Sequence, residues 1–145
     1  MAVKPLRSTG LQSLSLTVTT AGTYPSGEMS IPMGASVIVA QAAFARGAGG
    51  TTCDVFIQTS VDNGSTWIDI MQFAFATTTV TKISAVRPYI ATAANVTPTD
   101  GSLTDNTILD GVIGDRLRVK TVVVGTYLGA STLDGWLFLL AHLAV

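Results

Sequence analysis

The chain has 145 residues, which suits one domain of ordinary size. Its 8 Lys+Arg against 9 Asp+Glu leave a formal charge of −1, which argues against a nucleic-acid partner held by neutralised phosphates. A single cysteine, Cys53, and a single histidine, His142, exclude an internal disulfide, a thiolate metal cluster and a multi-histidine metal site.

The low fraction of charged residues is the most informative feature of the composition. Only 12% of the residues are charged, against roughly 25% in average soluble domains, while 48% are hydrophobic, so the disordered class is excluded. Monomers that stay dissolved alone cover themselves with charged side chains, whereas buried interfaces are depleted in charge. The mean hydropathy of +0.49 therefore indicates a subunit that hides surface against neighbours rather than a free enzyme.

The N-terminus carries two cations, Lys4 and Arg7, without a following apolar segment, so we predict no cleavable signal peptide. We expect residues 1–10 to be a flexible arm that contacts a neighbour in an assembly, and residues 11–145 to form a single domain.

The apolar stretches 35–45 and 136–141 are shorter than the roughly 18 to 20 residues that cross a bilayer. We therefore expect buried strands, no membrane partner, and synthesis in a cytoplasm.

Strand signals dominate the chain, because short runs rich in Thr, Val and Ile alternate with turn residues, and helical periodicity is absent. Around the Asn63-Gly64 step two alternating strands form a hairpin. The segment 21–34 is turn-rich and allows at most short pairing. The predicted strands are 14–19, 36–46, 53–60, 67–73, 77–84, 116–124 and 135–145.

The longest connection, residues 91–106, is small, polar and turn-rich, and we predict it to be the mobile or contact-making loop. Both tryptophans, Trp67 and Trp136, lie in strands that read as buried. About eight short strands predict an all-β chain, an antiparallel β-sandwich or jelly roll in one domain, with a small closed barrel as the alternative.

One motif stands out at the hairpin turn, where the sequence fits S-x-D-x-G-x-T-W. The carboxylate of the aspartate can accept backbone N–H groups of its own turn, the glycine supplies a positive φ, and the tryptophan anchors the turn on the sheet. This resembles the Asp-box of sialidase propellers and other β proteins, which implies a structural turn lock; a glycan-contacting loop is the alternative. The lock residues are Ser60, Asp62, Gly64, Thr66 and Trp67.

The order of features also resembles small accessory β-sandwich proteins of tailed-phage virions. A hairpin at 58–67 is followed by a Gly-Asp-Arg-Leu-Arg-Val strand at 114–119 and an apolar last strand, so the resemblance covers residues 52–145. It implies a virion structural role, such as a capsid decoration (cement) protein, and such proteins often assemble as trimers at three-fold positions of the shell.

No sequence pattern supports a catalytic role for the residues that could carry one. His142 reads as a structural histidine because no nucleophile elbow accompanies it, and Cys53 reads as a small core residue. The carboxylate pairs Asp105/Asp110 and Asp110/Asp115 lack the dense alternation of a calcium loop and read as solvated. We predict no catalytic residue, no metal and no cofactor.

A basic stripe, Arg116, Arg118 and Lys120, projects from one face of a single strand because its members are two residues apart. It is either an ordinary solvated face that pairs with Asp or Glu on a neighbouring strand, or a docking stripe for an acidic partner with Arg118 at its centre.

These observations predict a non-enzymatic virion protein that bridges capsid subunits, with itself (trimer favoured) and the major capsid or another virion protein as partners. A tail, neck or collar subunit and a glycan-binding jelly-roll module remain as alternatives. The glycan hypothesis needs exposed aromatics, and Tyr24, Tyr89 and Tyr127 form no cluster in the sequence.

Overall fold

The computed structural model describes residues 7–8, 12–31, 35–88 and 90–141. Strands and loops make up all of these residues, and none of them lies in a helix, so no helix is present that could span a membrane. The strands are β1 Arg7–Ser8, β2 Gln12–Thr17, β3 Gly22–Pro25, β4 Met29–Ser30, β5 Ala35–Ala45, β6 Ala48–Gly49, β7 Thr52–Ser60, β8 Ile68–Phe75, β9 Val80–Val86, β10 Arg116–Val124, β11 Tyr127–Leu128 and β12 Thr132–Ala141.

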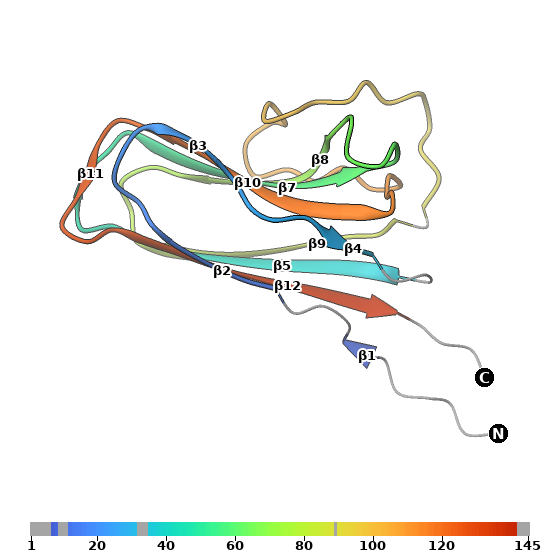
Figure 1. The fold of residues 1–145 in the computed structure, drawn as a ribbon, viewed down its shortest axis with the longest axis horizontal. Coiled ribbons are helices and arrows are strands. Elements are labelled where there is room, and N and C mark those ends of the chain that lie inside the picture. Colours follow the sequence, from blue (N-terminus) through green and yellow to red (C-terminus); the bar gives the residue numbers. More distant parts are fainter. Residues whose placement is uncertain (1–6, 9–11, 32–34, 89, 142–145) are drawn as a thin grey trace.

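Ten of these twelve strands form two antiparallel sheets that face each other, and β6 pairs with β11 in a separate two-stranded sheet (Figure 1). In sheet A, β12 lies between β5 and the pair β1 and β2, and β9 follows β5. In sheet B the order is β3-β10-β7-β8, with β4 also paired to β10. Among the longer strands the chain changes sheet at every connection except the β7–β8 hairpin, which is the strand order of a jelly roll. The predicted all-β sandwich is therefore confirmed.

Most predicted strands are found with small shifts at their ends. The strand at 116–124 is β10 with identical bounds, and the strand at 36–46 is β5, one residue earlier at each end. The last strand was predicted from residue 135 but begins at Thr132, because Thr132, Leu133 and Asp134 already pair with β5. Residues 142–145, including His142, lie outside the described part of the chain.

The core lies between the sheets and follows from alternation along each strand. In β10 every second residue from Leu117 to Val123 is buried, on the side opposite the basic stripe, and Cys53 of β7 is fully buried. Burial, and secondarily the charge of Asp54, raises the pKa of the Cys53 thiol to about 12, so the thiol stays protonated. This confirms Cys53 as a core residue.

An aromatic group closes one end of the core. The ring of Phe44 on β5 lies 5.3 Å from that of Phe75 and 5.5 Å from that of Tyr127, centre to centre. The Tyr127 hydroxyl donates a hydrogen bond of 2.7 Å to the carbonyl of Ala76, so this buried polar atom is satisfied.

The backbone edge of β8, the last strand of sheet B, is covered by another segment of the chain. The segment 99–109, within the long connection between β9 and β10, runs along this edge (Figure 1). Its backbone bonds join Asp69 N to Thr99 O (2.8 Å), Gln72 N to Thr107 O (3.0 Å) and Leu109 N to Ile70 O (2.9 Å). Part of the stretch predicted to be a mobile or contact-making loop therefore takes the place of an edge strand of sheet B.

We predict that Phe44→Ala lowers the free energy of unfolding by about 3–5 kcal/mol, because it removes a buried ring and leaves a cavity that its two aromatic neighbours cannot fill. Urea denaturation measures the change. The matched control is Val61→Ala, at a side chain that is 62% exposed, which should change the unfolding free energy by less than about 0.5 kcal/mol. Equal effects of the two substitutions would contradict this account of the core.

Candidate interaction surfaces

The hairpin turn between β7 and β8 is held by side-chain hydrogen bonds of the Asp-box-like motif. The Thr66 N–H donates to Asp62 Oδ1 (2.7 Å), the Ser60 hydroxyl donates to the same oxygen (2.9 Å), and the Gly64 N–H donates to Ser60 Oγ (2.8 Å). Asn63 and Gly64 have φ values of 64° and 89°, the positive φ that tight turns need. The hydrogen bonds predicted for Asp62 within its own turn are present.

Trp67 connects this turn to the basic stripe. Its side chain is buried, and the guanidinium of Arg118 lies 4.1 Å from the centre of its ring. At that distance a cation over an aromatic face is attracted by the ring's electron density. The turn lock and the stripe, which the sequence treated as separate features, are therefore one contiguous structure.

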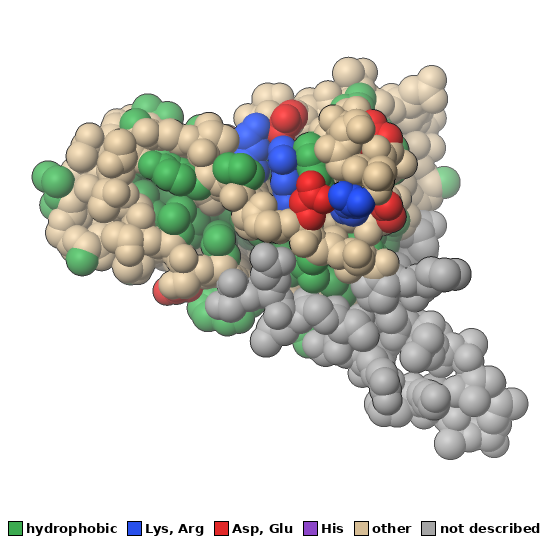
Figure 2. All heavy atoms as spheres, viewed as in Figure 1, with side chains coloured by type: hydrophobic (Ala, Val, Ile, Leu, Met, Phe, Trp, Pro, Cys, Tyr) green, Lys and Arg blue, Asp and Glu red, His purple; other side chains and the backbone are tan. Residues whose placement is uncertain are grey.

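Each cation of the stripe forms an ion pair within the chain. Arg116 Nη1 lies 2.6 Å from Glu28 Oε2, while Arg118 Nη2 and Lys120 Nζ lie 3.3 Å and 2.9 Å from Asp100 Oδ1. Figure 2 shows positive and negative side chains side by side on this face. The stripe thus has the intramolecular pairing of an ordinary charged face, with acids supplied by loops rather than by a neighbouring strand.

The nearby cations affect the pKa of Asp100. Its partial burial acts to raise the pKa, but hydrogen bonds from Lys120 and Gln58, together with the charges of Lys120 and Arg118, outweigh this and hold the pKa below its usual value. Asp100 therefore stays ionised and pairs with two of the three cations of the stripe, Arg118 and Lys120.

Beneath Asp100 lies a buried polar network that was not predicted from the sequence. The carboxylate of Asp69 on β8 accepts Gln58 Nε2 (2.7 Å) and the three consecutive backbone N–H groups of residues 101–103 (2.8–3.1 Å). Arg118 Nε donates to Gln58 Oε1 (2.7 Å). Asp69 and Gln58 are fully buried, so they join sheet B to its covering segment. The sequence held one signal of this network, which is that Gln58 and Asp69 are polar residues within otherwise apolar strands.

Sheet A has a different outer surface. Its outward positions on β5, β9 and β12 carry Val39, Ile83 and Phe138, and also Trp136, which is 37% exposed. Ile83 is 65% exposed. The prediction that both tryptophans are buried was wrong for Trp136, because its position on β12 points away from the core, whereas its neighbours Leu133 and Leu137 point inward.

We call the residues Val39, Gln41, Ile83, Trp136 and Phe138 the sheet A patch; they line a shallow hollow of about 390 Å³. Gln41 pairs in register with both Trp136 and Ile83, so the three side chains form a row across the sheet. Among the described outward-facing residues of the four main strands of sheet A, Asp134 is the one charged side chain.

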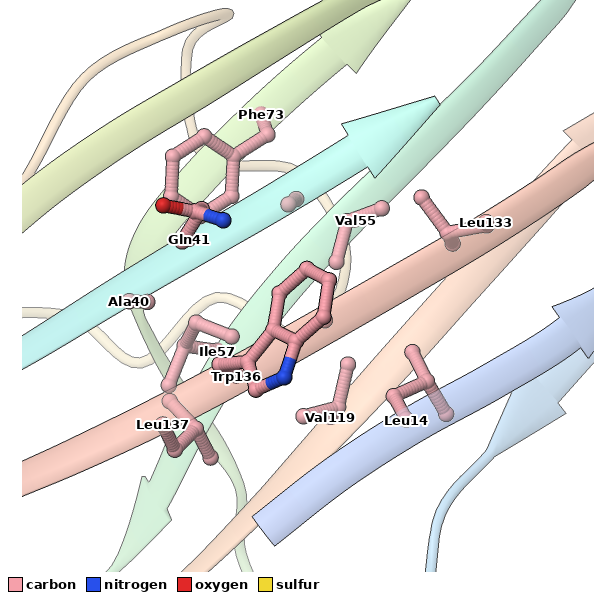
Figure 3. A pocket seen from close by; sticks show the side chains of 12 residues that line it. Leu14, Ala40, Gln41, Val55, Ile57, Phe73, Val119, Leu133, Trp136 and Leu137 are labelled. Atoms are coloured by element: carbon pink, nitrogen blue, oxygen red, sulfur yellow. The ribbon is translucent and has the colours of Figure 1, made fainter. Parts of the chain in front are cut away.

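A small void of about 10 Å³ lies beside the patch, where Gly135 leaves a core-facing position without a side chain. Figure 3 shows Trp136 and Gln41 with the core residues Val55, Ile57 and Phe73 that also line it. The lining is apolar and the volume is that of about one water probe, so the void fits a dry packing defect rather than a ligand site.

The other sequence candidates do not converge on one site. Gln72 donates to Asp105 and Arg87 pairs with Asp110, and the described residues hold no group of three or more potential metal ligands. Tyr24 is partly exposed, while Tyr127 is buried. Arg7 lies in β1 beside the end of β12. Lys4, Tyr89 and most of the predicted arm at 1–10 lie outside the described residues.

Comparison of the sequence with protein-family models and with curated proteins gives no match.

We predict that Asp62→Asn destabilises the fold at neutral pH and that the destabilisation shrinks in acid. Hydrogen bonds from Thr66 and Ser60 lower the pKa of Asp62 from 3.8 to about 2 in the folded protein. A depressed folded pKa contributes stability that is present above pH 4 and lost as the pH falls towards 2. Denaturant unfolding of both proteins from pH 6 to pH 2 measures this, and a difference that does not change with pH would contradict it.

We predict that Asp69→Ala releases the segment 99–109 from β8, because several buried donors lose their acceptor at once. The free energy of unfolding should fall by more than about 2 kcal/mol, and amide hydrogen exchange should accelerate at residues 101–103. The matched control is Asp134→Ala on sheet A, which should leave exchange in this segment unchanged. Unaltered exchange in Asp69→Ala would show that the network does not hold the segment.

Proposed function

We propose that the chain is a non-enzymatic structural subunit of a virion, a capsid decoration (cement) protein that bridges neighbouring subunits of the shell. Its partners are other copies of itself, with a trimer favoured, and the major capsid or another virion protein. It is made in the host cytoplasm and acts on the assembled particle. No catalytic group, cofactor, nucleic acid or membrane enters this function.

The observation that carries the proposal is the sheet A patch. An exposed Trp136 and an Ile83 that is 65% exposed lie on either side of Gln41, on a face where Asp134 is the one charged side chain among the described outward residues of the four main strands. This face presents largely apolar surface to water. Contiguous exposed apolar surface marks sites where proteins associate. The low overall charge points the same way, because interface cores are depleted in charged residues.

The jelly-roll strand order and the resemblance over residues 52–145 support the choice of a virion among assembly proteins. The mechanism is linkage: a protein that binds only the assembled shell stabilises that state by mass action. A tail, neck or collar subunit would use the same apolar face, and particle architecture distinguishes it from a capsid protein.

A second candidate, glycan binding, is favoured by one specific observation. The indole of Trp136 lies beside the Gln41 amide in a shallow hollow, and an aromatic surface with a neighbouring polar group is a usual composition of a small-molecule site. Specific labelling of a glycan array by the purified chain, lost in Trp136→Ala, would favour this candidate.

We predict that virus particles purified from the source that encodes the chain contain it in a fixed copy number relative to the major capsid protein. Quantitative mass spectrometry of gradient-purified particles measures the ratio, and immunogold labelling locates the chain on shell or tail. Labelling confined to the tail or neck would move the function to a tail subunit. Intact particles that lack the chain would overturn the virion role.

A further inference from the structure

We infer that Asn63 is a self-modification site, at which the backbone nitrogen of Gly64 attacks the side-chain amide and converts it to a carboxylate, and that the turn lock restrains this reaction while the chain is folded. Asparagine is among the chemically labile side chains of proteins. The chain has one Asn-Gly step, since the other two asparagines, Asn95 and Asn106, precede valine and threonine. The inference goes beyond the proposed function and does not depend on it.

The reaction takes water as its one co-reactant. The Gly64 nitrogen gives up its proton to solvent and forms a bond to Cγ of Asn63, and the side-chain nitrogen takes up a proton and leaves as ammonia. The resulting five-membered succinimide ring then adds water, which opens one of its two C–N bonds. Opening at Cγ yields aspartate on an unchanged backbone. Opening at the backbone carbonyl carbon yields isoaspartate, in which the main chain runs through Cγ.

The fold requires at position 64 the residue that makes this attack easy. Gly64 has a φ of 89°, and a Cβ there would lie 3.3 Å from Glu28 Oε1 and 3.4 Å from Arg116 Nη1. Both the backbone conformation and the neighbouring charged groups therefore favour glycine. The absence of a side chain also leaves the Gly64 nitrogen unshielded by its own residue. Because Asn63 is exposed, water reaches its amide.

The turn lock restrains the attacking nitrogen. The Gly64 N–H donates a hydrogen bond of 2.8 Å to Ser60 Oγ, and the Ser60 hydroxyl donates to Asp62 Oδ1 (2.9 Å). Hydrogen bonds from Thr66 and Ser60 lower the pKa of Asp62 to about 2, so this carboxylate is ionised. Loss of the Gly64 proton would break the bond to Ser60 and place a second negative charge near Asp62. The closed turn thus makes the nitrogen a poorer nucleophile than it is in a free chain.

The amide under attack is restrained as well. Its Oδ1 accepts a hydrogen bond from Arg116 on β10, and the backbone of Asn63 is held at a φ of 64°. Ring closure has to carry Cγ to bonding distance of the Gly64 nitrogen, which turns that nitrogen away from Ser60 and the amide away from Arg116. The reaction therefore proceeds from an opened turn, and local opening of the lock sets its rate.

The two products differ in what they do to the turn. Aspartate at position 63 keeps the backbone, and its carboxylate can accept the Arg116 guanidinium in place of the amide oxygen. It adds one negative charge, near Asp62 and Glu28, to a chain of formal charge −1. Isoaspartate lengthens the main chain within the turn, so the hydrogen bonds that join Gly64 to Ser60 lose their spacing. Modification through the isoaspartate branch therefore undoes the lock.

The test measures conversion of Asn63 in the full chain at mildly alkaline pH. Peptide mapping after incubation in heavy-oxygen water labels each new carboxylate. In guanidinium chloride, where the chain is unfolded, Asn63 should react faster than Asn95 and Asn106. Folding should slow the reaction at Asn63 by about tenfold or more, because opening the turn breaks hydrogen bonds of the lock. Equal rates in the folded and unfolded chain, or an unfolded chain in which Asn63 does not react, would overturn the inference.

Ser60→Ala tests whether the lock is the restraint. This change removes the acceptor of the Gly64 N–H and should raise the rate at Asn63 in the folded chain by about fivefold or more. The matched control is Phe44→Ala, which weakens the core and leaves the hydrogen bonds of the turn in place. Circular dichroism verifies that both variants are folded. A wild-type rate in Ser60→Ala, or equal acceleration in both variants, would show that the lock does not control the reaction.

Two substitutions at position 63 identify the product. Asn63→Asp supplies the aspartate form directly and should co-elute on anion exchange with part of the aged wild-type protein. Asn63→Gln has a longer side chain, which would have to close a larger ring, and should stay unmodified over the same time. An acidic form that still accumulates in Asn63→Gln at the wild-type rate would place the modification at another residue.

Discussion

The carboxylate of Asp69 is the interaction on which the arrangement of the molecule depends. It gathers the backbone N–H groups of residues 101–103 and the amide of Gln58 in a buried site. A buried carboxylate is tolerated only where donors compensate its lost hydration, and successive backbone N–H groups form such an anion-binding cradle. This cradle fixes the long β9–β10 connection against sheet B and thereby makes the two outer faces of the sandwich different.

The charged residues follow from this asymmetry. With the connection in place, Asp100 lies over β10 and pairs with both Arg118 and Lys120, while Arg118 also lies over Trp67. The hairpin turn, the basic stripe and the covering segment therefore support one another. Surface ion pairs taken singly contribute little to stability, but these share partners with a buried hydrogen-bond network, where coupling is stronger. The three cations of the stripe on sheet B are thus paired within the chain.

Sheet A has no equivalent cover among the described residues, and this is the face on which the proposed function rests. Trp136 and Ile83 stand on a face that the core does not use, and Gln41 between them is a neutral polar residue rather than a charge. Such a face, in a chain with so few charges, is what supports the proposed role in an assembly. The fold accordingly has two different outer faces. The face of sheet B is polar, with its charged side chains paired within the chain, and the face of sheet A is apolar and suited to association.

The amino-acid sequence by itself determined the all-β class, the β7–β8 hairpin and the inward set of β10, because alternation and turn residues are local properties. It also determined the hydrogen bonding of Asp62, which is confined to one turn. Tertiary structure decided three other things: that Asp134 continues β12, that Trp136 faces outward, and that Asp69 binds a segment more than thirty residues away. Each depends on which strand or loop lies opposite. The alternation of residues along a strand separates its two faces, but when both faces are apolar it does not show which of them meets the core. Pairing between segments that are far apart in the sequence leaves no local pattern at all.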